Sequence, residues 1–188
     1  MQAIPIDQIF DAQELQDEYS AFQLIDYNAL RIECAATGIE LSEDPVEGGI
    51  SKLNGIIAQI DAQKTRVANI VNQSIKNESD LEVLYRKTLG VYKREFDTRL
   101  PQPPCSDFSN AGAREACCNS LLENLVKLKL AVEGSYHQSK TFTKMAQNDL
   151  NKLDSTNKNI SRQITVLQLT MDIGEIQRQS GPSPHSFQ

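Results

Sequence analysis

Large aromatic and histidine side chains are scarce in this sequence of 188 residues, which has no tryptophan, six phenylalanines, five tyrosines and two histidines. A compact globule of this length normally buries more aromatic side chains, whereas a narrow seam between helices needs fewer. His137 falls within a predicted helix, where we expect a surface position, and His185 falls in a polar tail. Without clustered histidines, acid–base catalysis would depend on carboxylates. These are scattered over predicted helix faces, so we expect no catalytic residue and no enzymatic activity.

The sequence also lacks the short motifs that mark an activated nucleophile or a bound phosphate. It contains no Gly-x-Ser-x-Gly elbow. Gly48-Gly49 is not followed by the Gly-Lys-Ser/Thr of a phosphate-binding loop. We therefore expect no cofactor.

The four cysteines, Cys34, Cys105, Cys117 and Cys118, have a spacing that does not suit a metal. Structural zinc sites use four ligands with short spacers between them, whereas Cys117 and Cys118 are adjacent. We expect no metal site. One of these two residues would instead fill the start of a helical seam, because free cysteine behaves as a small buried hydrophobic residue. A disulfide between Cys105 and Cys117 would require an oxidising environment.

Long apolar runs are absent as well. No segment approaches the roughly 20 apolar residues that cross a bilayer. The first residues have neither the basic nor the apolar region of a secretory signal. We expect a cytoplasmic protein, or one assembled into a particle that is made in the cytoplasm, and no membrane partner.

What the sequence does contain is a heptad repeat in its second quarter. The apolar positions alternate in steps of three and four, which places one stripe along a helix and requires a partner helix to cover it. This predicts a helix from about 46–50 to about 99, ended by Leu100-Pro101 because a residue before proline avoids the helical region. The ladder consists of Ile50, Leu53, Ile57, Ile60, Val67, Val71, Leu81, Tyr85 and Tyr92.

A second long helix is predicted after a proline-rich turn near 101–109, beginning at Asn110–Ala113. Its apolar ladder changes phase between Phe142 and Leu153, an eleven-residue step that indicates a four-residue insertion into the heptad. Gly134-Ser135 and residues 154–157 are the expected breaks. The ladder consists of Leu121, Leu125, Leu128, Val132, Phe142 and Ala146, followed by Leu150, Leu153, Ile160, Ile164, Leu167 and Met171.

A further helix is predicted over about 9–37, with Thr37-Gly38 as its stop. The fold class is therefore all-α: an elongated, coiled-coil-like antiparallel helical hairpin with an additional N-terminal helix, since short connections make neighbouring helices antiparallel. The expected organisation is an acidic N-terminal helix and linker over 1–45, the hairpin over 46–180 and a polar tail over 181–188.

Charge is unevenly distributed along the chain. Residues 1–50 carry eleven acidic residues and one basic residue, whereas the remainder has a net charge of +4. The acidic segment is either a solvated helix face or an arm that docks on basic helices. The basic residues of the last helix are Lys127, Lys129, Lys140, Lys144, Lys152, Lys158 and Arg162.

Long helices with polar seam positions and no chemical motif are typical of structural and interaction proteins. We expect a helical scaffold, adaptor or assembly component, a class that includes parts of viral and phage particles, with protein partners or a homo-oligomer. The alternative is an oligomeric nucleic-acid-handling accessory factor that presents the basic helix face. We expect Phe108 to staple the start of the last helix, with display to a partner as the alternative, and Leu84 to widen the stripe for a second contact. The partner-binding candidates are Leu84, Phe108, Lys140, Lys144 and Lys152.

Overall fold

A computed structural model describes residues 12–22, 25–35 and 49–179. These residues form helices and connecting turns and contain no strand, which confirms the all-α fold class. The helices are α1 (Ala12–Ala21), α2 (Tyr27–Ala35), α3 (Gly49–Arg99), the 3-10 helix η1 (Cys105–Asp107), α4 (Ala111–Leu121) and α5 (Glu123–Gln179).

The described chain divides into two compact units, and each contains one stretch of α3 and one of α5. Unit 1 comprises the described residues up to Ala29 together with Asn72–Lys144, and so includes α1, η1 and α4. Unit 2 comprises those of Leu30–Val71 and the described residues from Met145 onward.

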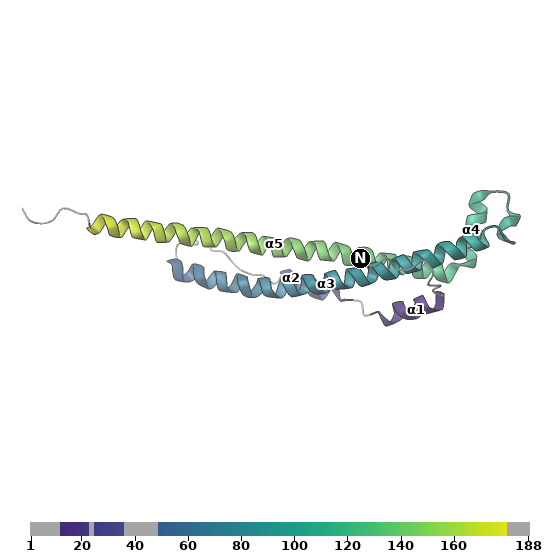
Figure 1. Cartoon of the computed structure of the whole chain (residues 1–188), viewed down its shortest axis with the longest axis horizontal. Helices are drawn as coiled ribbons and strands as arrows, with labels where there is room; N and C mark the ends of the chain where they lie inside the picture. The colour runs from purple at the N-terminus through teal and green to yellow at the C-terminus, as the bar shows by residue number, and fades with distance from the viewer. Residues whose placement is uncertain (1–11, 23–24, 36–48, 180–188) are drawn as a thin grey trace, which may run out of the picture. The chain divides into compact units, whose positions relative to one another are not determined.

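Within unit 1, α3 and α5 lie side by side and run antiparallel (Figure 1). The Tyr85 ring stacks on the Tyr136 ring with centroids 5.6 Å apart. Further along α3, the Tyr92 ring carries the ammonium group of Lys129 at 4.7 Å from its centroid. As residue numbers rise along α3, those of the partners fall along α5, which confirms the antiparallel hairpin here.

Unit 2 repeats this arrangement with polar contacts at the edge of its seam. Lys64 Nζ lies 2.7 Å from an Asp154 carboxylate oxygen. The Asn157 side-chain amide donates to the Asp61 carboxylate at 2.7 Å. The two stretches are therefore antiparallel in this unit as well.

The buried face of α3 differs from the predicted ladder by one residue in every second position. The column of Leu53, Ile60, Val67 and Leu81 is buried as predicted. The other predicted column was wrong, because only Val71 is buried among its positions 57, 64, 71, 78, 85 and 92. The buried column lies one residue earlier, at 56, 63, 70, 77, 84 and 91.

Polar residues explain that error. Gln63 and Asn77 belong to the buried column and look unfavourable in a ladder chosen for apolar character. Each is tolerated because its side chain is hydrogen-bonded: Gln63 Nε2 donates to the Glu33 carbonyl at 3.3 Å, and Asn77 donates to other buried side chains.

The predicted phase change in the last helix is also wrong. Helix α5 runs without interruption through Gly134-Ser135 and through residues 154–157. Ser139 is fully buried and keeps the seven-residue period, but a serine is not counted in an apolar ladder. Buried residues follow one another at intervals of seven without an insertion: Leu125, Val132, Ser139, Ala146, Leu153 and Ile160.

Near the start of the last helical segment, the structure has a break that the sequence analysis missed. Helix α4 ends at Leu121, and Leu122 adopts a non-helical φ of −103° before α5 begins at Glu123. The expected start of this segment is confirmed, because Asn110 caps α4 and its side chain accepts from the Gly112 amide at 2.8 Å.

The single N-terminal helix predicted over about 9–37 is wrong, since two helices occupy its described part. Asp26 causes the restart: one carboxylate oxygen accepts from the amides of Asn28 at 3.0 Å and Ala29 at 3.1 Å, which caps α2. The bounds of α3 agree with the prediction. The predicted linker over 38–45 and the tail over 181–188 lie outside the described residues.

Candidate functional site

The predicted candidate Leu84 lies in the core and not on a surface. Its side chain is 1% exposed and belongs to the apolar cluster of unit 1 with Leu15 and Val132. The expectation that Leu84 flanks the seam and leaves surface for a second contact is therefore wrong. Ile56 and Ile70, which lie in the same column of α3, are buried too.

Phe108 follows η1 at the tip of unit 1 and is 46% exposed. Its amide donates to the Cys105 carbonyl at 3.4 Å, which closes the short 3-10 turn. The ring is not among the residues of the buried cluster of this unit. This exposure fits display of Phe108 better than a staple under α4.

The three lysine candidates are exposed, and two of them have contacts on their own helix. Lys140 Nζ lies 5.7 Å from the centroid of the Tyr136 ring. Lys152 pairs with the Asp149 carboxylate at 3.2 Å. Lys144 is exposed one turn after Lys140.

Helix α1 packs against the other helices of unit 1 mainly through apolar side chains. Leu15 is fully buried, and the Tyr19 hydroxyl lies 3.0 Å from the Ser135 hydroxyl on α5. Glu18 of this helix forms an ion pair with Lys87 of α3 at 2.9 Å. The acidic segment was predicted to be either a solvated helix face or an arm docked on basic helices, and this pair involves α3.

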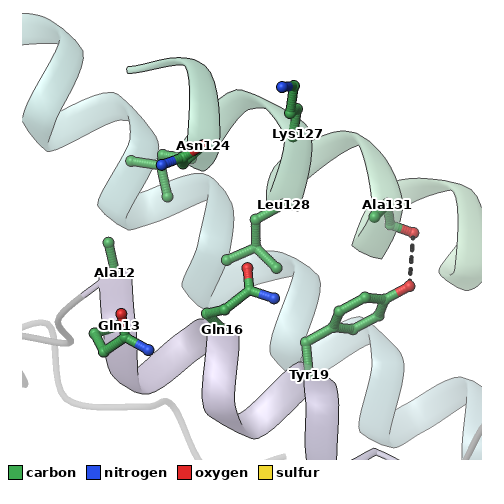
Figure 2. Close-up of a pocket in the computed structure, with 9 residues that line it drawn as sticks. Ala12, Gln13, Gln16, Tyr19, Asn124, Lys127, Leu128 and Ala131 are labelled. Atoms are coloured by element: carbon green, nitrogen blue, oxygen red, sulfur yellow. Dashed lines mark hydrogen bonds between the residues drawn. The ribbon is translucent and has the colours of Figure 1, made fainter. Parts of the chain in front are cut away.

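A groove of about 600 Å³ lies between α1 and α5 in unit 1. Figure 2 shows Tyr19 reaching across it toward the Ala131 carbonyl, while Lys127 points away from α1. The Gln16 amide donates to Ser20 at 3.4 Å, so this polar group is engaged within α1. The lining offers no nucleophile or acid–base pair and reads as the margin of a packed helix.

A polar cluster sits inside the seam of unit 1. The Asn77 side-chain amide donates to the Tyr27 hydroxyl of α2 and to the Ser139 hydroxyl of α5, the latter at 3.3 Å. Burial raises the pKa of Tyr27, so this phenol stays neutral and available as a hydrogen-bond partner. No buried polar side-chain atom among the described residues lacks a partner, so the burial of this polar cluster is compensated by hydrogen bonds.

Three thiols gather at the tip of unit 1. Cys105 in η1 and Cys118 in α4 are fully buried, and Cys117 is half-buried beside them. The Cys105 thiol contacts the Cys117 sulfur at 2.9 Å. Cys118 lies 3.6 Å from the Phe96 carbonyl. The prediction that Cys117 or Cys118 fills the start of this seam is confirmed for Cys118.

An exposed apolar surface of unit 2 lies on the last part of α5. It comprises Val166, Leu169, Ile173 and Ile176, which we call the α5 stripe, and each side chain is between 55% and 63% exposed. At about 100° per residue, these positions lie roughly opposite the seam residues Ile160 and Ile164. Met171 continues the seam and is 62% exposed.

The sequence analysis missed the α5 stripe because it followed one ladder only. The signal was present: 166, 169, 173 and 176 are spaced by three, four and three residues, the same spacing as a seam. With Met171 on the opposite side, this part of the helix is apolar on two faces. Such a helix is expected to be covered on both.

Comparison with protein-family models, curated proteins and solved structures gives no match. Within the ranges that the structure describes, no helix combines the length and apolar character needed to cross a membrane. The same ranges bring together no group of three His, Cys, Asp or Glu side chains placed to hold a metal ion.

Proposed function

We propose that this chain is a non-enzymatic structural and interaction protein, a helical scaffold, adaptor or assembly component that associates with a second copy of itself through the α5 stripe. The observation that carries this proposal is the set of four large apolar side chains, each more than half exposed, on the face opposite the seam. Exposed apolar side chains grouped at helical spacing typically mark an interaction surface.

A second copy suits the stripe because its spacing is symmetric. In an antiparallel pair related by a twofold axis, Val166 of one copy lies opposite Ile176 of the other, and Leu169 lies opposite Ile173. A parallel pair would instead bring Arg162 of each copy, which precedes the stripe on the same face, against its counterpart. Charge therefore favours the antiparallel arrangement.

The size of the stripe predicts weak association. It covers about three turns, roughly 16 Å of helix. Standard stable interfaces bury about 800 Å² on each partner, more than four side chains on one short stretch supply. We expect reversible pairing that becomes strong only where several contacts act together.

The test uses a charge swap across the twofold axis. One variant carries Leu169→Lys and Ile173→Lys, and a second carries Leu169→Glu and Ile173→Glu. Each alone should stay monomeric in sedimentation velocity at concentrations where the wild type associates, because like charges face each other. An equimolar mixture should associate again, through opposite charges.

Leu130→Lys is the matched control, since Leu130 is 58% exposed on the same helix but outside the stripe. It should associate like the wild type. A wild type that remains monomeric at millimolar concentration, or a mixture of the two variants that does not pair, contradicts the proposal.

The alternative predicted from sequence, a nucleic-acid-handling factor, has less support. Lys127 pairs with Glu123 at 2.6 Å and Lys152 pairs with Asp149, so part of the predicted basic face is neutralised locally. Salt-sensitive binding of a labelled oligonucleotide, lost on Lys140→Glu with Lys144→Glu, would favour this alternative.

A further inference from the structure

The thiols at the tip of unit 1 carry an inference independent of self-association. Cys105 and Cys117 are twelve positions apart and meet because the turn after α3 folds η1 back against α4. Their sulfur atoms are 2.9 Å apart. A disulfide bond is about 2.05 Å long, so the sulfurs would have to approach by roughly 0.9 Å.

We propose that Cys105 and Cys117 are a modification site: they form an intramolecular disulfide by exchange with a low-molecular-weight disulfide such as oxidised glutathione. The bond joins η1 to α4 and closes a loop at the tip of unit 1.

Exposure sets the order of the two steps. Cys117 is half-buried, whereas Cys105 and Cys118 are fully buried, so the small disulfide meets Cys117 first. The Cys117 thiolate attacks one sulfur of the reagent, which forms a mixed disulfide and releases one glutathione thiolate. The Cys105 thiolate then attacks the Cys117 sulfur, forms the protein disulfide and releases the second glutathione thiolate.

The two steps balance without another reactant. Two cysteine thiols lose two protons and two electrons in total, and oxidised glutathione takes them up as two molecules of glutathione. The hydrogen bond with the Cys105 thiol is the largest cause that raises the pKa of Cys117, and burial is the second largest. Since the thiolate is the nucleophile, the reaction rate should rise about tenfold for each unit by which pH increases, as long as pH stays below that pKa.

The neighbouring Cys118 is the main competitor. Its sulfur also contacts Cys105, and burial is the largest of the causes that raise its pKa. Its full burial keeps the reagent away, and its sulfur is directed to the Phe96 carbonyl at 3.6 Å. We therefore assign the disulfide to Cys117.

The experiment treats the reduced full-length protein with oxidised glutathione, blocks remaining thiols and measures intact mass. Of the four free cysteines, two should be consumed with no glutathione retained. Trypsin cleaves after Arg114, so the disulfide should link the peptide that contains Cys105 to the one that contains Cys117 and Cys118.

Variants distinguish the two adjacent cysteines. Cys117→Ser should abolish the linked peptide, whereas Cys118→Ser and Cys34→Ser should retain it. Circular dichroism checks that each variant keeps the wild-type helicity, and the oxidised wild type should melt at a higher temperature than the reduced form. A link that survives Cys117→Ser and is lost in Cys118→Ser overturns the assignment. A stable glutathione adduct, or a disulfide between two chains, overturns the intramolecular disulfide itself.

Discussion

Asn77 on α3 donates a hydrogen bond from its side-chain amide to the Ser139 hydroxyl on α5, 3.3 Å away, inside the buried seam of unit 1. The same amide group also donates a hydrogen bond to the Tyr27 hydroxyl of α2. One asparagine therefore joins three helices at a level where the seam is polar. The cost of losing it should exceed that of a typical surface substitution.

We expect Asn77→Ala to lower the free energy of unfolding by about 1–3 kcal/mol, because it leaves buried hydroxyl groups without their partner. Urea denaturation followed by circular dichroism measures this change. Asn72→Ala, an exposed position on the same helix, should change stability by less than about 0.5 kcal/mol. Equal effects at both positions would show that the seam does not depend on this polar contact.

Leu84 provides a second test of the seam register. We expect Leu84→Ala to cost about 2–5 kcal/mol of unfolding free energy, since the side chain is 1% exposed and its removal leaves a cavity. The adjacent residue Val83 is 37% exposed, and Val83→Ala should cost much less in the same denaturation experiment. If the two losses are equal, or Val83→Ala costs more, the buried column of α3 has been assigned incorrectly.

The sequence predicted the elements that end at strong local signals. Pro101 stops α3 and Asn110 starts α4, because both act through the backbone of their own neighbours. The restart at Asp26 also has a local cause, but the apolar spacing of the predicted helix continued through it and concealed the cap.

Tertiary contacts account for most of what the sequence analysis missed. Asn77 and Ser139 are acceptable in a seam because they are hydrogen-bonded to each other, and Asn77 also to Tyr27, which no single helical pattern reveals. The contact between Cys105 and Cys117 depends on how the turn folds back. The α5 stripe was visible in the spacing of Leu169 and Ile173, but the sequence analysis predicted an apolar seam on the opposite face of the helix only.

The ion pair between Lys64 and Asp154 predicts a specific titration in unit 2. A side-chain hydrogen bond from Lys64 holds the pKa of Asp154 below its ordinary value. A carboxyl whose folded pKa is depressed stabilises the fold above its unfolded pKa, near 3.9, and that contribution is lost as pH falls through the folded pKa. We expect nuclear magnetic resonance titration to find the Asp154 pKa below the Asp average.

The control for this titration is Lys64→Met, which should return the Asp154 pKa toward its ordinary value. Since both members of the pair are partly exposed, added salt should shrink the difference between wild type and variant. An Asp154 pKa that does not respond to Lys64→Met means that the pair does not persist in solution.

The packing of α1 within unit 1 should depend on apolar burial more than on charge. Leu15 is fully buried among residues of α3, α4 and α5, whereas the ion pair between Glu18 and Lys87 is partly exposed. Exposed pairs contribute about 0–1 kcal/mol, and removing a buried leucine costs about 2–5 kcal/mol. We therefore expect Leu15→Ala to release α1 locally, with rapid amide hydrogen exchange over Ala12–Ala21 while α3 stays protected.

Lys87→Met should change exchange in α1 only slightly, and high salt should have a similarly small effect on the wild type. Faster exchange in Lys87→Met than in Leu15→Ala would mean that the acidic helix is held by its charge.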